Sequence, residues 1–162
     1  MEQLPQESLD PRIKKAWRLN DGFWIAILFI CCFIPLCLVS LVAEEPILDV
    51  IVVITLVVFI LIAILCLVVL PPIRYARWRF AMDENYLDIA KGIIWRKRYI
   101  IPFIRVQNTD TRQGPIMRMF GLSSVTVSTA AGAHEIPGLD TAQAAVLRDK
   151  AAEFARLARE DV

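Results

Sequence analysis

The groups in this sequence that could do chemistry are one histidine, four cysteines and several clusters of arginine and lysine. His134 stands in AAGAHEIPGL, a pattern typical of a turn that runs into a short strand. No serine or cysteine nucleophile with a matching base can be assembled around it, and no HExxH pattern, phosphate-cradling glycine loop or functional carboxylate pair occurs. We therefore expect a non-enzymatic protein with no catalytic residue, no cofactor and no metal site.

The cysteines are a second candidate for chemistry. Cys31, Cys32, Cys37 and Cys66 all lie within apolar runs, and none has metal-ligand spacing with a histidine or a carboxylate. We interpret them as small apolar packing residues.

Cationic side chains remain, and they can bind phosphate or carboxylate groups. Arg96, Lys97 and Arg98 are consecutive in a predicted strand, where alternation should turn Lys97 away from the other two. The candidates for binding a lipid or a protein partner are Arg74, Arg77, Arg79, Arg96, Lys97, Arg98, Arg105 and Arg118. The alternative is general adhesion to anionic membranes without headgroup selectivity.

The elements that position these cations begin with two apolar runs, residues 23–43 and 47–70. Each exceeds the roughly 18–20 residues that cross a hydrocarbon core as a helix, and Asp49 is their only charge. Because only Glu44, Glu45 and Pro46 join them, residues 23–70 are predicted to form a transmembrane hairpin, with a kink at Pro35.

The distribution of lysine and arginine predicts the orientation of this hairpin. Four cations precede it, three follow it, and none lies in its turn, so the positive-inside rule places both termini in the cytoplasm. Pro71 and Pro72 are expected to end the second helix, and Tyr75 and Trp78 to lie at the membrane interface.

Residues 1–22 are predicted to be a cytoplasmic tail. Asp10 and Pro11 suit the start of a helix, and Ile13, Ala16 and Trp17 share one face of it. Two interpretations stay open: a basic amphipathic helix on the membrane surface, or a disordered tail.

Residues 71–162 have the pattern of a soluble α+β domain. Candidate strands cover residues 74–82, 86–92, 93–101, 104–111, 123–129 and 134–138, and a closing helix covers residues 139–160. In the fifth strand Val125 and Val127 are expected to face inward, and Ser124, Thr126 and Ser128 outward. This order predicts a bent antiparallel sheet or small barrel capped by the C-terminal helix.

Several other residues have structural interpretations. Gly92 and Gly121 are expected in turns that need positive φ. Trp95, Phe120 and Leu122 are expected in the core.

Three stretches resemble the bacterial pleckstrin-homology-like (PH-like) membrane proteins of the short YdbS-like type. They are LDPRIKKAWRL, then residues 89–132, which begin IAKGIIWRKRYII, then IPGL before the closing helix. The resemblance covers almost the whole chain and is most specific over residues 101–129. It implies a bacterial inner-membrane protein and a PH-like fold of two bent antiparallel sheets closed by a C-terminal helix.

The resemblance implies no catalytic residues. It implies a non-enzymatic role in assembly, as a homo-oligomer or with a larger membrane protein that carries several PH-like domains, in envelope maintenance or tolerance of membrane-active peptides. A possible pairing edge in IPGL agrees with assembly.

The alternative function is recognition of anionic lipid headgroups by the basic face. In eukaryotic PH domains this site uses basic residues of the first hairpin, whereas that hairpin here carries Asp83 and Glu84. A transporter is disfavoured because the spans lack buried ionisable groups, and no nucleic-acid motif occurs.

Overall fold

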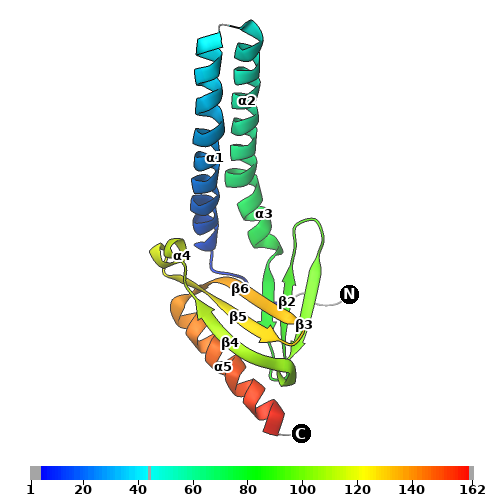
Figure 1. Ribbon diagram of the computed structural model, residues 1–162. Coiled ribbons are helices and arrows are strands. Elements are labelled where there is room, and N and C mark those ends of the chain that lie inside the picture. The colour runs from blue at the N-terminus through cyan, green and yellow to red at the C-terminus, as the bar shows by residue number, and fades with distance from the viewer. Residues whose placement is uncertain (1–4, 44, 161–162) are drawn as a thin grey trace. The chain divides into compact units, whose positions relative to one another are not determined.

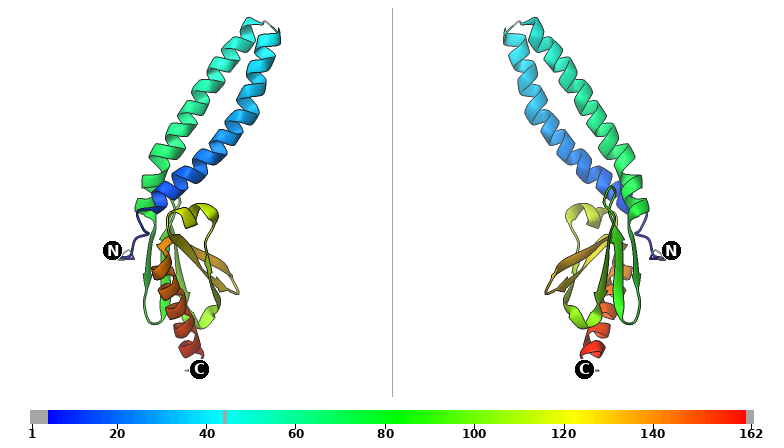
Figure 2. Two further views of the ribbon diagram at one scale, coloured as in Figure 1. Left: turned by 90° about the vertical axis from the view of Figure 1, so that its left-hand side faces the viewer. Right: turned by 90° about the vertical axis from the view of Figure 1, so that its right-hand side faces the viewer.

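The computed structural model describes residues 5–43 and 45–160, which form two compact units (Figure 1, Figure 2). One unit comprises residues 17–72. The other joins the described part of residues 1–16 to the chain from Ile73 onward.

Long apolar helices make up most of the first unit. α1 (Ile13–Ala43) is followed by α2 (Pro46–Ile64), a π-helical segment (Leu65–Val69) and α3 (Leu70–Arg77). The start of α1, up to Ala16, and the part of α3 from Ile73 onward belong to the other unit. The stretches Ile13–Ala43 and Pro46–Arg77 are each long and apolar enough to cross a membrane. Side chains such as Leu41 and Val42 are 76% and 85% exposed, whereas a soluble protein would bury such helices. The two apolar helices expected from the sequence are confirmed.

Aromatic and polar contacts join α1 to α2 within this unit. The Phe29 ring lies 4.6 Å from that of Phe33 and 5.3 Å from that of Phe59 on α2. Near the connection, the buried Ser40 hydroxyl donates a hydrogen bond to the Asp49 carboxylate. The one acid in the apolar runs therefore has a partner.

The prediction that Pro71 and Pro72 end the second helix is wrong. Both lie in the first turn of α3, and the helix continues through them, because the Leu70 N–H still donates to the Leu65 carbonyl. The π-helical segment directly before them supplies a wider turn at the junction. Residues 74–77 are consequently helical and not part of a strand.

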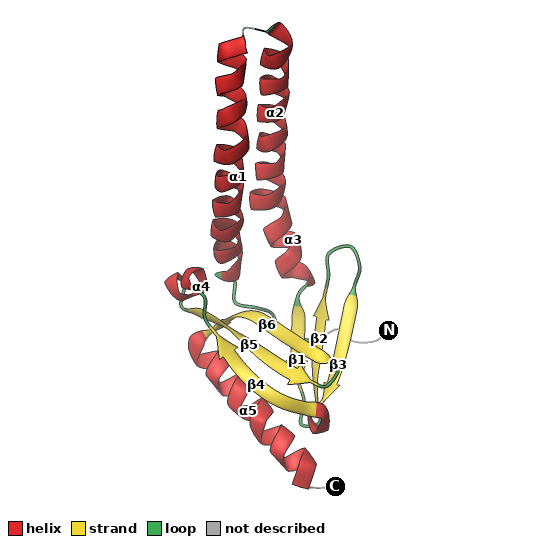
Figure 3. Ribbon diagram, viewed as in Figure 1, coloured by secondary structure: helices red, strands yellow, loops and turns green. Residues whose placement is uncertain are grey.

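Two three-stranded antiparallel sheets form the second unit (Figure 3). One has the order β1 (Arg79–Met82), β2 (Tyr86–Lys91), β3 (Lys97–Pro102), with Phe80 opposite Ile89. The other has the order β4 (Val106–Arg112), β5 (Leu122–Thr129), β6 (Gly132–Asp140), with Val125 opposite Ile136. A 3-10 turn (Phe103–Arg105) precedes β4, and α4 (Pro115–Met119) precedes β5.

The closing helix α5 (Thr141–Glu160) packs against the second sheet and the 3-10 turn (Figure 1). Phe154 of this helix lies 5.3 Å from the fully buried Phe103 ring. The core is built from alternating strand residues, including Leu87, Ile89, Val106, Leu122, Val125, Val127, Ile136 and Leu139. The expected PH-like arrangement of two sheets and a C-terminal helix is confirmed.

Residues 5–16 belong to this domain and do not form a separate surface tail. Glu7 exchanges two backbone hydrogen bonds with Phe80 of β1, at 2.9 and 3.0 Å, and the Asp10 N–H donates to the Gly138 carbonyl at 2.9 Å. Ile13 is fully buried against Gly138. The apolar face that the sequence assigned to a membrane surface is therefore covered by the domain itself.

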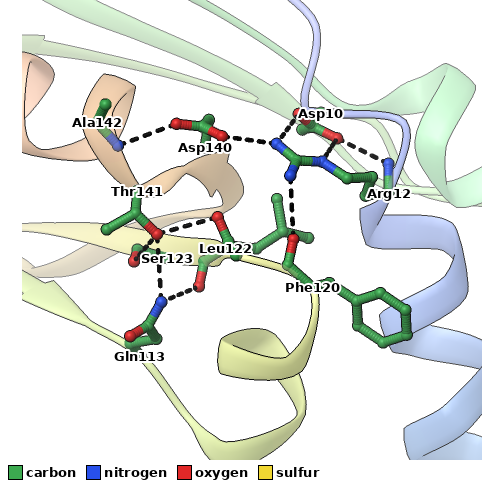
Figure 4. Close-up of polar contacts among 10 residues, drawn as sticks. Asp10, Arg12, Gln113, Phe120, Leu122, Ser123, Asp140, Thr141 and Ala142 are labelled. Carbon is green, nitrogen blue, oxygen red and sulfur yellow. Dashed lines mark hydrogen bonds and ion pairs between the residues drawn. The ribbon is translucent and has the colours of Figure 1, made fainter.

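Arg12 ties this segment to two distant parts of the chain (Figure 4). Its guanidinium donates to both carboxylate oxygens of Asp10, to Asp140 at 2.7 Å and to the Phe120 carbonyl at 3.1 Å. Asp140 also caps α5, because its other oxygen accepts the Ala142 N–H at 3.0 Å. These hydrogen bonds from Arg12 hold the pKa of the Asp10 and Asp140 carboxyl groups below the usual value of 3.8.

Other expectations have mixed outcomes. Gly92 and Gly121 have positive φ, 123° and 64°, as expected. Leu122 is in the core, as expected. Ser124 and Thr126, which were expected to be solvent-facing, are buried in β5, the central strand of its sheet.

Candidate functional site: a basic cleft beside the β2–β3 hairpin

A cleft of about 350 Å³ in the second unit gathers most of the predicted cationic candidates. This volume lies within the range of small-ligand sites, about 300–1,000 Å³. Two alanines and six cations line the cleft: Ala76, Arg77, Arg79, Ala90, Lys91, Arg96, Lys97 and Arg98.

The strand register explains why these residues meet. β1 begins directly after α3, and Arg79 lies opposite Ala90 of β2. Across the next pair, Ala90 lies opposite Arg98, and Lys91 lies opposite Lys97 at the end of the hairpin. The small Ala90 side chain leaves room between the flanking cations, so the end of the hairpin and the end of α3 form the two sides of one cleft.

Three of the six cations are held by contacts inside the domain. Arg98 forms a two-pronged ion pair with the buried Asp88, with the shortest N–O distance 2.7 Å. Arg79 donates to the Trp78 carbonyl at 2.7 Å and so satisfies an acceptor at the end of α3. The Lys91 ammonium lies 5.7 Å from the centre of the Trp78 ring and 5.4 Å from that of Tyr99.

The other three cations are directed to solvent. Arg77, Arg96 and Lys97 are exposed, and within residues 5–43 and 45–160 the structure gives their side chains no ion pair or hydrogen bond. Cations without an internal acid can bind an external anion without first breaking an ion pair. Guanidinium groups are especially suited to phosphate, which accepts two parallel hydrogen bonds.

The remaining predicted site residues lie elsewhere. Arg74 lines an adjacent cleft together with Trp78, Trp95 and Lys97. Arg105 is exposed in the 3-10 turn before β4, and Arg118 is exposed on α4. Neither lines the basic cleft.

Two features of the cleft differ from the sequence-based expectation. Alternation separated Lys97 from Arg96 and Arg98, but all three line the cleft, and Arg96 lies in the loop before β3 begins. Lys91 was missed. Its position opposite Lys97, across the predicted hairpin, is the signal that could have found it.

Charge is distributed unevenly along β2. Its first end follows a turn that carries the exposed acids Asp83 and Glu84, and its last residue, Lys91, belongs to the basic cleft. The basic site therefore lies at the end of β2 that is far from the first turn, where the second hairpin meets Arg79 of β1 and the end of α3.

His134 is a packing residue on β6. Its ring lies 4.7 Å from that of Tyr99, and burial, with a smaller effect of the Lys91 charge, lowers its pKa below 6.5. No group of three potential metal ligands occurs in the described part of the chain.

A second depression of about 840 Å³ lies between the N-terminal segment and α5. Glu7 and the acids of the first turn form one side, and Val146, Leu147 and Phe154 supply apolar surface from the helix. Its lining mixes apolar side chains with acids and Lys150, so its character differs from that of the basic cleft.

The comparisons with known proteins agree with this architecture. The family described as "Bacterial PH domain" matches residues 23–155. The chain is 33% identical to "UPF0699 transmembrane protein YdbS" of Bacillus subtilis (strain 168), over 169 aligned positions that cover the whole of both proteins. No solved structure matches. The match to the family and the full-length match to its transmembrane relative show that the chain belongs to the YdbS-like bacterial PH-domain membrane proteins, which are not a known enzyme family.

Proposed function

We propose that this protein is a two-span protein of the bacterial plasma membrane whose PH domain binds the phosphate of anionic lipid headgroups. One observation carries the proposal: Arg77, Arg96 and Lys97 line one cleft and have no internal acid as partner within the described residues. The fold alone would not support it, since many PH-like domains serve other purposes.

Both termini are proposed to be cytoplasmic. Lys14, Lys15 and Arg18 precede the first apolar run, three arginines follow the second, and the connection between the runs has no cation. A reporter protein that works only in the cytoplasm should be active when it is fused after Val162. Activity of a reporter that works only outside the cytoplasm would contradict this orientation.

Two of these arginines lie close in sequence to the membrane-spanning run, which supports a lipid headgroup as the ligand. Arg74 and Arg77 follow Leu70, the last residue of the apolar run, within the same helix α3. At about 1.5 Å per residue they lie about 6 and 10 Å beyond it along the helix axis. The polar layer on each side of a bilayer is about 5–8 Å thick, so Arg74 lies at headgroup depth and Arg77 lies just beyond it, on the cytoplasmic side.

The expected size of the effect follows from the number of available cations. Attraction to anionic lipid contributes about 1 kcal/mol per cation near the surface. Neutralising Arg77, Arg96 and Lys97 together should therefore weaken anionic-lipid binding by about 3 kcal/mol, roughly a hundredfold.

The test counts lipids on the full-length protein, because the spans anchor it in any membrane. The protein would be equilibrated with equal amounts of phosphatidylglycerol and phosphatidylcholine, and native mass spectrometry would count the lipids retained. The variant Arg77→Gln/Arg96→Gln/Lys97→Gln should lose the preference for phosphatidylglycerol. The control Arg105→Gln/Arg112→Gln/Arg118→Gln removes the same charge from exposed positions outside the cleft and should retain it.

If both variants lose the preference for phosphatidylglycerol equally, the preference comes from general adhesion to anionic lipid. That result would overturn the proposal that the cleft is a specific site. Calorimetric titration with glycerol phosphate separates the two sources of phosphate. Saturable binding of the soluble compound that requires the three cleft cations, together with no preference for phosphatidylglycerol in the lipid count, would indicate a soluble ligand in place of a lipid.

Assembly is the second candidate function. The depression between the N-terminal segment and α5 favours it, because Val146 there is 54% exposed and adjoins apolar surface from Leu147 and Phe154. The IPGL edge is a weaker argument, since the Gly138 carbonyl already accepts a hydrogen bond from Asp10. The partner would be another copy of this chain or a larger membrane protein with several PH-like domains. Affinity capture of the full-length protein and its Val146→Asp variant from native membranes tests this, and the variant should lose the partner.

A further inference from the structure

The loop between β2 and β3 exposes two large apolar side chains. Ile94 is 85% exposed and Trp95 is 81% exposed, more than any other large apolar residue described in the PH-domain unit. The sequence suggested that Trp95 is a core residue. The structure places it in solvent because β3 begins only at Lys97 and residues 92–96 form the loop.

The path of this loop depends on a backbone conformation that only glycine adopts without strain. Gly92 has φ of 123°, and a Cβ at this position would lie 1.9 Å from the Trp95 carbonyl oxygen. An L-residue there would force the loop to rearrange. The conformation that presents Ile94 and Trp95 is therefore built into the fold.

Cations surround the base of this apolar tip. Arg96 and Lys97 line the basic cleft beside it, and Arg74 lines the adjacent cleft with Ile93 and Trp95. A membrane interface offers the same sequence of environments, with acyl chains beneath anionic phosphates. The centre of a protein–protein interface, in contrast, is usually depleted of charge.

The position of the loop fits the same partner. Arg74 and Trp78, which share a cleft with Trp95, lie on α3 and at its end, close in sequence to the last residue of the apolar run. Trp is enriched at membrane interfaces because its ring has an apolar body and one polar N–H group.

We propose that Ile94 and Trp95 insert into the cytoplasmic membrane interface as an apolar wedge. The proposal rests on the proposed function in one respect, that the cations around the wedge face headgroup phosphates. Insertion would fix the orientation of the domain on the bilayer and place the basic cleft at headgroup depth.

The test measures membrane depth at single positions of the full-length protein. A background in which Cys31, Cys32, Cys37 and Cys66 are replaced by alanine would receive Ile94→Cys or Trp95→Cys, each carrying a spin label. Ala130→Cys in the exposed β5–β6 turn is the matched control. The protein would be reconstituted into vesicles of equal phosphatidylglycerol and phosphatidylcholine.

Power-saturation measurements compare collisions with oxygen, which concentrates in the bilayer, and with a water-soluble nickel chelate. We expect an oxygen-to-nickel ratio severalfold higher at positions 94 and 95 than at position 130. Adding Gly92→Ala should lower the ratio at position 94 toward the control, since it disturbs the loop. Equal ratios at all three positions overturn the wedge. Shielding from both reagents also overturns it, because the tip would then be buried in a protein contact.

The outcomes separate this inference from headgroup binding. A high ratio that persists in pure phosphatidylcholine supports the wedge even if the lipid-counting experiment finds no preference. Retained preference for phosphatidylglycerol with a control-like ratio at position 94 overturns the wedge and leaves the proposed function standing.

Discussion

Replacing Gly138 by alanine should detach the N-terminal segment from the PH domain. Gly138 has φ of 64°, and its new Cβ would lie 2.5 Å from Cγ1 and Cδ1 of Ile13 and 2.7 Å from its Cβ. The close atoms include the rigid, branched part of a fully buried side chain, so a rotamer change cannot relieve the overlap.

The magnitude follows from two separate costs. Left-handed backbone conformation costs an alanine about 1–2 kcal/mol, and overpacking of a filled site costs about 1–3 kcal/mol. Gly138→Ala should therefore destabilise this contact by about 2–5 kcal/mol. A factor of ten in the exchange rate corresponds to about 1.4 kcal/mol. Hydrogen exchange of the amides in β6 and in residues 5–13 should therefore accelerate by at least about thirtyfold.

A double-mutant cycle isolates the contact. Ile13→Ala alone should cost about 2–5 kcal/mol because it empties a buried site. In the double variant the overlap disappears and only the backbone strain remains, so about 1–3 kcal/mol should be recovered relative to additive effects. Exchange rates measured by mass spectrometry on the full-length protein in detergent provide the four values. Strict additivity would refute the seating of Ile13 on Gly138, and with it the assignment of residues 5–16 to the domain.

Two further predictions concern ion pairs. Arg98→Ala should destabilise the domain by up to about 3 kcal/mol in urea unfolding, because it leaves the Asp88 carboxylate buried without its guanidinium. The double variant with Asp88→Ala should regain much of that loss, and an equally unstable double variant would contradict the reasoning. The lowered pKa values of Asp10 and Asp140 mean that protonation weakens the Arg12 contacts. The stabilisation from these two carboxylates is complete well above pH 3.8, and it is lost as the pH falls below 3.8 through their pKa values in the folded protein. Amide hydrogen exchange in residues 5–13 should therefore become faster in that acidic range. Asp140→Asn should flatten this pH dependence, and an unchanged profile would count against it.

Hydrophobic periodicity was sufficient to predict two apolar helices, a set of antiparallel strands and a closing helix, and the family resemblance supplied the PH-like arrangement of two sheets. The two apolar runs, the strand around Val125 and Val127 and the closing helix each follow from a repeat that only one kind of element buries efficiently. Errors arose where one residue type has two structural roles. Pro71 and Pro72 can end a helix or occupy the first turn of the next, and only the π-helical segment before them decides between the two.

The basic cleft was predictable in composition and not in arrangement. Clustering identified Arg77, Arg96 and Lys97, but sequence spacing could not bring α3 beside the second hairpin or show that Asp88 holds Arg98. The exposure of Trp95 was missed for a related reason. An aromatic residue in an apolar stretch suggests a core strand, whereas the turn at Gly92 moves the start of β3 past it.

The charge layout of β2 supports the proposed orientation of the domain as well as the proposed binding site. The acids Asp83 and Glu84 lie just before β2, and the cations of the cleft lie at its far end, about 17 Å away at 3.3 Å per residue. That separation is about twice the screening length at physiological salt, roughly 8 Å, so the acids do little to offset the cations. An anionic surface attracts one end of β2 and repels the other. The chain's formal net charge of +1 conceals this polarity. Because the β2–β3 loop lies at the attracted end, the electrostatics that would fill the cleft would also direct Ile94 and Trp95 toward the bilayer.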